Sequence, residues 1–319
     1  MKSKLLVAAC VVTALGAGSG SAAAAEKVKA GILKMAALTN LWVAKEAGIF
    51  AKNGLEVELV EFRNGNEAIN AHRAGSVDFV LSIPGTAMTA TERGFDLVLL
   101  TQNETAKAQG PDAGSIMVLM DSPYKTLADL SGKRIAVSAL HSQMAVATQV
   151  ALSKGGADMS KMQVMEMPLP SMGDALKSKQ VDAVAHLDPW VTQLQTTGVA
   201  RNLSWLYVDS IPEQPIGAWY ATSGFLAKKK DVAMSFVKSI QEAIDYMKAD
   251  EPRARKNVAL FTGLDPKLTE AMPLNNWEYR ITPARWQATI DMMVKSGELQ
   301  QAHKVEEYIS DVSRQFVVK

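Results

Sequence analysis

Two stretches of similar pattern, AGSVDFVLSIPG (Ala74 to Gly85) and SKQVDAVAHLDPW (Ser178 to Trp190), determine the fold that we predict. Each stretch ends a helical pattern, enters an apolar strand through Val-Asp, and stops at a proline. Asp78 and Asp182 stand at the entrances of these strands, whereas ligands of open α/β sheets bind beyond the carboxyl ends. We therefore expect two halves of similar architecture and a structural role for both aspartates.

The same alternation extends over most of the chain, from Lys27 to about Ser223. Runs of four to eight apolar or alternating residues predict strands, and longer amphipathic runs predict helices. The predicted strands are 28–33, 55–62, 77–82, 97–101, 116–120, 134–137, 163–167 and 181–187, and the predicted helices are 41–53, 67–74, 85–93, 143–154 and 172–179. This alternation predicts an α/β protein in which each half is a mainly parallel sheet flanked by helices.

The C-terminal part has a helical pattern from Lys229 onward, with Asp231 as a candidate N-cap and Thr282-Pro283 as the start of a later helix. We expect these helices to pack on the first half, which the chain re-enters near Trp219. The predicted lobe 1 therefore comprises residues 26–114 and 218–319, and lobe 2 comprises residues 115–217, with a ligand cleft between the two lobes.

The first 25 residues have the pattern of an export signal. Lys2 and Lys4 precede an apolar run from Leu5 to Leu15, and small residues lead to a cleavage site that we place after Ala25. Cys10 follows Val-Ala-Ala as in a lipoprotein signal, but the apolar run before it is short, so lipidation is less favoured. We therefore predict secretion into the periplasm.

The composition of the mature chain excludes several classes of function. The only cysteine lies in the predicted signal, so disulfides and thiolate metal sites are excluded. Of 34 basic residues two lie in the signal, and the rest balance 33 acidic residues, which argues against nucleic acid or an anionic membrane as partner. The four histidines show no metal-ligand spacing. We predict no metal, no cofactor and a monomer.

The residues that follow the strands are the candidate ligand-binding residues, because these ends of the strands meet at the cleft. They are Thr39, Asn40, Leu41, Trp42, Ser82, Pro84, Gly85, Thr86, Asn103, His141, Ser142, Gln143, His186, Asp188, Trp190 and Trp219. Ordinary alternatives remain open for several of them. Ser142 suits a helix N-cap, Asp188 with Pro189 suits a helix-starting turn, and Trp42 and Trp219 suit core packing.

The segment LSGKRIAVSALHSQ, Leu130 to Gln143, resembles a phosphate loop only superficially. In a phosphate loop the lysine follows its strand, whereas Lys133 precedes the strand here and the Ser/Thr is missing. The turn after the strand, Ser138 to Gln143, opens a helix whose free N–H groups favour an anionic group.

Several ordered segments resemble the periplasmic substrate-binding proteins of ABC importers in the nitrate/sulfonate/taurine group, which shares a domain with thiamine-pyrimidine-precursor binders. The matching segments are WVAKEAGIFAKNGLEV from Trp42, AGSVDF from Ala74, LADLSGKRIAV from Leu127, VDA from Val181, and Asp188-Pro189. The resemblance implies a type II periplasmic-binding-protein fold that closes on a small molecule and docks with an ABC permease and its ATPase. His141-Ser142-Gln143-Met144 departs from the Ser-Thr-Thr-His of taurine-type members, which argues against taurine itself.

We predict a solute receptor without catalytic activity, and its ligand is expected to be a small organic anion, sulfonate- or taurine-like or an aromatic acid. Two alternatives remain. One is an enzyme on the same scaffold, a periplasmic dehydratase or a pyrimidine-synthase-like protein, in which Asp188 with His141 or His186 would supply acid–base groups. The other is a receptor that reports to a signalling partner.

Overall fold

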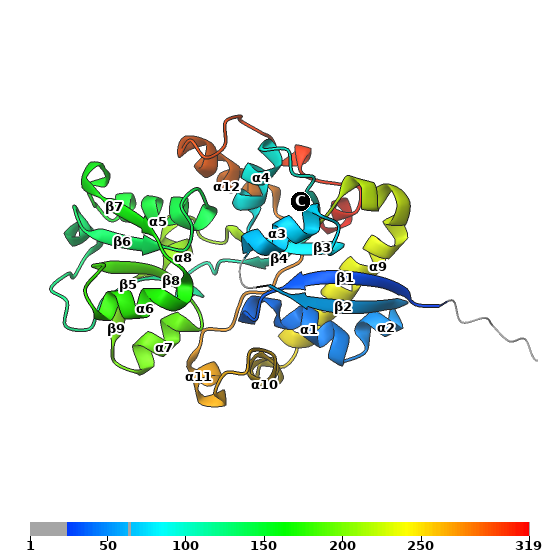
Figure 1. Ribbon diagram of the computed structural model, residues 1–319, viewed down its shortest axis with the longest axis horizontal. Helices are drawn as coiled ribbons and strands as arrows, with labels where there is room; N and C mark the ends of the chain where they lie inside the picture. The colour runs from blue at the N-terminus through cyan, green and yellow to red at the C-terminus, as the bar shows by residue number, and fades with distance from the viewer. Residues whose placement is uncertain (1–23, 63–64, 319) are drawn as a thin grey trace, which may run out of the picture.

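The computed structural model describes residues 24–62 and 65–318, which form two lobes, each built around a five-stranded sheet (Figure 1). The predicted signal lies almost wholly outside the described residues. The lobe 1 sheet consists of β1 (Glu26–Ile32), β2 (Leu55–Glu61), β3 (Phe79–Ser82), β4 (Val98–Thr105) and β10 (Pro215–Ala221). Its order is β2-β1-β3-β10-β4, with β10 antiparallel to both neighbours.

The lobe 2 sheet repeats this topology. It consists of β5 (Gly114–Leu119), β6 (Arg134–Val137), β7 (Gln163–Glu166), β8 (Ala183–Leu187) and β9 (Ala200–Ser204). Its order is β7-β6-β8-β5-β9, and β5, the strand that enters from lobe 1, is antiparallel to both neighbours. The prediction of two similar, mainly parallel α/β lobes is therefore confirmed.

Asp78 and Asp182 occupy equivalent positions in the two lobes. The Asp78 carboxylate accepts a hydrogen bond from the backbone N–H of Lys29 at 2.7 Å, and the Asp182 carboxylate accepts one from Arg134 N–H at 2.9 Å. The Arg134 side chain also pairs with Asp182 and holds the pKa of that carboxyl below its usual value. Both aspartates thus tie a strand entrance to the neighbouring strand, which is the predicted structural role.

Helices cover both faces of each sheet (Figure 1). Lobe 1 carries α1 (Thr39–Glu46), α2 (Ile49–Lys52), α3 (Gly65–Arg73), α4 (Pro84–Glu92), α9 (Ser223–Lys248), α10 (Glu251–Thr262), α11 (Pro266–Ala271) and α12 (Pro283–Lys295). Lobe 2 carries α5 (Gln143–Lys154), α6 (Leu169–Lys177), α7 (Trp190–Thr196) and α8 (Leu206–Ser210). Short 3₁₀ turns lie at Ala36–Leu38, Leu127–Leu130, Met159–Lys161, Val305–Glu307 and Ser313–Phe316. As expected, the C-terminal helices pack on the core of lobe 1.

Three predicted elements differ from the structure. The helix expected over 41–53 is two helices, because Gly48 adopts a left-handed conformation with φ 71° between α1 and α2. The strand expected to end at Thr101 continues to Thr105, because its polar end pairs with β10. The C-terminal helix begins at Ser223, where the Thr222 side chain caps it, and not near Asp231; a kink at Lys229 interrupts it.

Two segments that run between the lobes are hydrogen-bonded to each other. Ala106 N–H donates to Gln214 O at 2.9 Å, and Glu213 N–H donates to Lys107 O at 3.2 Å. A pair of short linked segments of this kind is the usual place for hinge motion between domains. The limits proposed for the two lobes stay a prediction. Within residues 24–62 and 65–318, no helix has the length and apolar character that a membrane span requires.

Candidate functional site

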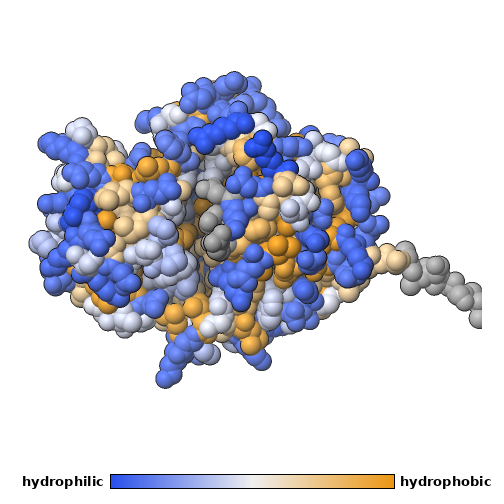
Figure 2. Space-filling model, in the orientation of Figure 1, coloured by the Kyte–Doolittle hydropathy of each residue, from blue (hydrophilic) through white to orange (hydrophobic). Residues whose placement is uncertain are grey.

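The starts of α4 and α5 meet between the two lobes. Figure 2 shows a hollow at the boundary between the lobes. Gly85 N–H donates to Gln143 Oε1 at 2.7 Å, and Gln143 N–H donates to Thr86 Oγ1 at 3.4 Å. The Gln143 amide nitrogen donates in turn to Gln214 Oε1 and Pro215 O, at 2.9 and 2.8 Å. Gln143 is completely buried, so one side chain links the two helix starts to the crossing segment.

Glycine is required at position 85 by this close approach. A Cβ atom there would lie 2.9 Å from Gln143 Oε1 and 3.0 Å from Met293. Its two predicted neighbours Ser82 and Pro84 are also buried, and Pro84 occupies the first turn of α4. The structure therefore places Ser82, Pro84, Gly85, Thr86 and Gln143 around one junction, as the strand-end rule predicts.

The other two residues of the α5 turn have structural partners. The Ser142 hydroxyl accepts from Ala145 N–H at 3.2 Å and donates to Ala139 O at 2.8 Å, which is ordinary N-capping. His141 has a positive φ of 28°, and its Nδ1 lies 3.1 Å from Glu298 Oε1, beyond the end of α12 in lobe 1. Its side chain is 70% exposed, so the contact between His141 and Glu298 lies at the solvent-exposed edge of the interface between the lobes.

A buried polar network lies beneath the α1 start in lobe 1. Asn103 Oδ1 accepts hydrogen bonds from Asn40 Nδ2 at 2.8 Å and from Trp219 Nε1 at 2.9 Å. Thr39 Oγ1 and Asn40 Oδ1 are buried and have no hydrogen-bond partner. Buried polar atoms without partners are uncommon in folded proteins, so these two atoms are available to a solute.

Trp219 and two of its predicted companions are packing residues. Trp219 has no exposed surface and packs edge-on against Phe236 with the ring centres 5.3 Å apart, so of the two alternatives left open for its indole, cleft wall and core packing, the structure shows core packing. Leu41 is likewise fully buried in the lobe 1 core. Trp42 is half-buried and packs against Phe261 of α10. The sequence pattern did not distinguish these core positions from cleft positions.

The remaining candidates of lobe 2, His186, Asp188 and Trp190, lie together at the end of β8. Asp188 Oδ1 accepts from Thr192 N–H at 3.0 Å and from Thr192 Oγ1 at 2.7 Å, so Asp188 starts α7 as the turn alternative proposed. His186 stacks on Trp190 with the ring centres 5.3 Å apart. Burial lowers the pKa of His186 to about 4, so its imidazole is neutral at pH 7. Asp188 Oδ2 and His186 Nε2 have no partner.

Three residues outside the predicted set lie close to these candidates. Glu104 is at the end of β4, Asp112 is in the crossing segment, and Tyr207 is in α8, and each is buried. The sequence signal for Glu104 was the polar run that follows the apolar part of its strand. Asp112 and Tyr207 carry no local signal, since only the return of the crossing segment brings them to the end of β8.

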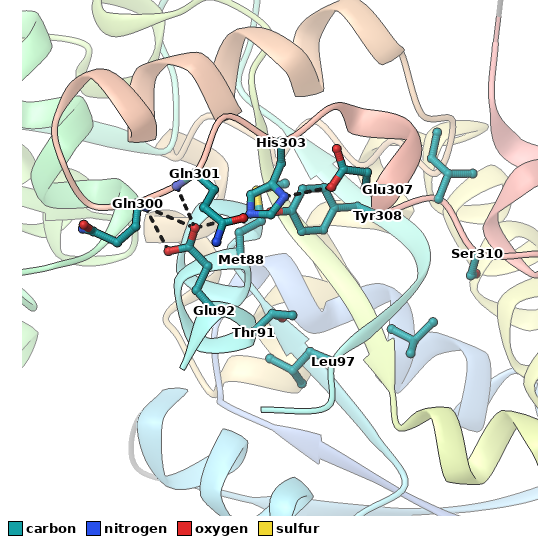
Figure 3. A pocket seen from close by; sticks show the side chains of 12 residues that line it. Met88, Thr91, Glu92, Leu97, Gln300, Gln301, His303, Glu307, Tyr308 and Ser310 are labelled. Atoms are coloured by element: carbon teal, nitrogen blue, oxygen red, sulfur yellow. Dashed lines mark hydrogen bonds and ion pairs between the residues drawn. The ribbon is translucent and has the colours of Figure 1, made fainter. Parts of the chain in front are cut away.

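A separate cavity of about 480 Å³ lies within lobe 1, between α4 and the C-terminal segment (Figure 3). His303 lies between two carboxylates there, with Nε2 3.3 Å from Glu92 and Nδ1 2.9 Å from Glu307. The hydrogen bond to Glu307 is the main reason that the pKa of His303 is raised. Glu92 also accepts from the backbone of Gln300 and Gln301, so the pair fastens the C-terminal segment to α4.

The raised pKa of His303 predicts a pH-dependent contribution to stability. The folded state holds this proton more tightly than the unfolded chain, so the contribution is complete below the unfolded pKa of 6.5 and is lost as pH rises through the folded value. We expect His303→Gln to lower the free energy of unfolding by about 0.5–1 kcal/mol at acidic pH, and by less at alkaline pH. Urea titrations across this range measure it; a deficit that grows with pH contradicts the assignment.

Among the described residues, no group of three or more His, Cys, Asp or Glu side chains has the geometry of a metal site. The pair of acids around His303 therefore does not constitute a metal centre by its geometry.

Two lobes of one topology, joined by paired crossing segments with helix starts facing between them, define the two-lobed α/β fold of periplasmic binding proteins. The chain belongs to the NMT1/THI5-like family, whose model matches residues 36–254. A putative binding protein of Brucella abortus (strain 2308) is 25% identical over 229 residues, which cover 70% of this chain and 67% of that protein.

Solved structures with the same fold are mostly those of binding proteins. The alkanesulfonate-binding protein SsuA from Xanthomonas axonopodis pv. citri has a TM-score of 0.74 at 23% identity, covering 89% of this chain and 98% of that one. The periplasmic nitrate-binding protein NrtA from Synechocystis PCC 6803 has a TM-score of 0.70 at 14% identity, covering 92% and 86%. The desulfurization enzyme DSZB also matches, with a TM-score of 0.66 at 16% identity and coverage of 91% and 98%.

Proposed function

We propose that this protein is the solute-binding component of an ABC importer, located in the periplasm and docking with a membrane permease and its ATPase. The observation that carries the proposal is the junction of α4 and α5, where both lobes and the crossing segment meet at Gln143. A solute that bridges the same groups would favour the closed arrangement of the lobes, and the closed form would be the one that the permease recognises.

The organic anion expected from the sequence would bind at the helix starts. The N–H groups of Gly85 and Gln143 donate to two side-chain oxygens, Gln143 Oε1 and Thr86 Oγ1. A sulfonate or carboxylate oxygen is a stronger acceptor than either of these neutral groups. The proposal is that such an oxygen replaces the Gln143 carboxamide at Gly85 when the solute binds.

A thermal-shift screen of the mature chain against sulfonates, aromatic carboxylates and pyrimidines tests the proposal. A ligand that binds only the folded state raises the melting temperature, because it adds about 2.7 kcal/mol to the free energy of unfolding at a ligand concentration a hundredfold above Kd. We expect a shift from at least one of these classes, retained in His303→Gln, with the solute recovered unchanged. Absence of any shift contradicts the proposal, and a shift lost in His303→Gln moves the site to the cavity of Figure 3.

An enzyme on this scaffold is the second candidate, and Asp188 is the observation that favours it. Burial raises the pKa of Asp188 to about 6, which suits a general acid or base near neutral pH. Recovery of a chemically altered solute in the same incubation would establish this candidate. A solute that stays unchanged while it stabilises the protein supports the receptor.

A further inference from the structure

Three buried carboxyl groups from different parts of the chain converge between the lobes. Glu104, Asp112 and Asp188 are only 4%, 2% and 5% exposed. Lys107 N–H donates to Asp112 Oδ1 at 3.4 Å, and Asp188 N–H donates to Ala113 O at 2.8 Å. These bonds place the end of β4, the crossing segment and the end of β8 next to one another, between the two lobes where we propose that the solute binds.

Each carboxyl group uses one oxygen to hold the fold. Asp112 Oδ1 accepts from Lys107, Asp188 Oδ1 accepts from Thr192, and Glu104 Oε1 accepts from Asn275 Nδ2 at 2.6 Å. The second oxygens, Asp112 Oδ2 and Asp188 Oδ2, are buried and have no partner. The hydrogen bonds that hold the fold need only one oxygen of each side chain. An asparagine or glutamine would provide that oxygen without a buried charge, so these bonds do not explain why the residues are acids.

Tyr207 provides an independent polar group at the same place. It is 2% exposed, and its hydroxyl has no hydrogen-bond partner. The ring packs closely on the start of β5, since a Cβ atom at Gly114 would lie 3.0 Å from it. The charges of Asp112 and Glu104 both act on the Tyr207 hydroxyl and add to the effect of burial, which raises its pKa. The Tyr207 hydroxyl is therefore buried, free to form a hydrogen bond, and within range of the charges of two carboxyl groups.

A positively charged group suits this cluster of carboxyl groups. Within the described parts of the chain, no lysine, arginine or histidine forms an ion pair with Glu104, Asp112 or Asp188 at 4.0 Å or less. Lys107 acts on all three only at longer range. Burial raises the pKa of Glu104 to about 8 and that of Asp188 to about 6, because a charge in this setting lacks compensation. A cation would provide it.

We infer that the solute carries a protonated nitrogen, an ammonium or amidinium group, which binds among Glu104, Asp112 and Asp188. The inference rests on the proposed function, because it assigns the chemical class of the solute for the same interlobe site. An ammonium group has three donors and no acceptor, which suits free carboxylate oxygens and a tyrosine oxygen. An acidic group on the solute would then lie toward Gly85 and Gln143, so the full ligand class is a small amino acid or amino sulfonate with separated charges.

Three matched probes distinguish the contributions of the cationic and the anionic group of the solute to binding. 4-(Aminomethyl)benzoate carries both groups, 4-methylbenzylamine carries only the cation, and 4-methylbenzoate carries only the anion. We expect the two amines to raise the melting temperature and to bind by calorimetry, and 4-methylbenzoate to bind at least about tenfold more weakly than 4-(aminomethyl)benzoate. Equal or tighter binding of 4-methylbenzoate overturns the inference and leaves the proposed receptor function intact. Failure of both amines to bind also overturns the inference, whereas the receptor function is contradicted only if the wider thermal-shift screen finds no ligand either.

Two conservative variants locate the cation. Asp112→Asn and Asp188→Asn keep the oxygen that holds the fold and remove the charge, and each is expected to weaken 4-methylbenzylamine binding at least about tenfold. Asp174→Asn, at an exposed carboxyl on α6 that is 84% accessible, is the matched control and is expected to bind as the wild type. Unchanged affinity in both Asp112→Asn and Asp188→Asn overturns the inference, because the amine would then bind elsewhere.

Discussion

Trp219→Ala is expected to lower the free energy of unfolding by about 3–5 kcal/mol, the range for removing a fully buried aromatic side chain. Trp219 has no exposed surface, packs edge-on against Phe236, and donates a hydrogen bond to Asn103 at 2.9 Å. Alanine leaves a cavity in the lobe 1 core and removes one donor from the Asn103 network. Urea titration followed by circular dichroism measures the loss.

Trp190→Ala is the matched control for this prediction. Trp190 is only half-buried and stacks on His186 at the end of β8, so its removal leaves the core of lobe 1 unaltered. We expect a loss of about 1 kcal/mol, as for an aromatic stack at a partly exposed site. A loss below about 1 kcal/mol for Trp219→Ala contradicts the core position and favours the other alternative, an indole that lines the cleft.

The affinity for 4-methylbenzylamine is expected to rise at least about tenfold between about pH 5.5 and pH 8. Burial raises the pKa of Asp188 to about 6 and of Glu104 to about 8, so both carboxyl groups hold protons in the empty protein at acidic pH. A cation binds the ionised carboxylates, so its binding releases protons and strengthens as pH rises. The amine itself stays protonated over this range, since alkylammonium groups titrate near pH 10.

Calorimetry at several pH values measures this dependence of amine affinity on pH. The raised pKa values of the two carboxyl groups also make the stability of the protein without ligand depend on pH. Native Glu104 and Asp188 bind protons that the unfolded chain has already lost, so the free energy of unfolding falls as pH rises toward 8. Glu104→Gln is expected to flatten this slope. Amine affinity that is constant or rises on acidification contradicts the assignment of these carboxylates.

The sequence predicts the architecture well because that information is local. The alternation of strands and helices, and the repeated Val-Asp entrances at Asp78 and Asp182, are patterns within short windows, and the two lobes follow from them. The strand end at 102–105 was missed because its residues are polar, and only its pairing with β10 makes it a strand. Propensity does not report that pairing.

The candidate site is predicted only in part, because its contacts join residues far apart in the chain. The strand-end rule finds Gly85, Gln143 and Asp188. It does not find that Gln143 bridges Gly85 and Pro215, or that Asp112 returns beside the end of β8. Burial is equally non-local, which is why Trp219 resembled a cleft residue in sequence and is a core residue in the structure.

A crystal structure of residues 26–319 with bound 4-(aminomethyl)benzoate would show directly where the solute binds. We expect the ligand between the lobes, with its amine within hydrogen-bond distance of Asp112 or Asp188 and its carboxylate toward Gly85. Density for the ligand in the cavity around His303, or on the outer surface of either lobe, would contradict the claim that solute binds where the two lobes meet.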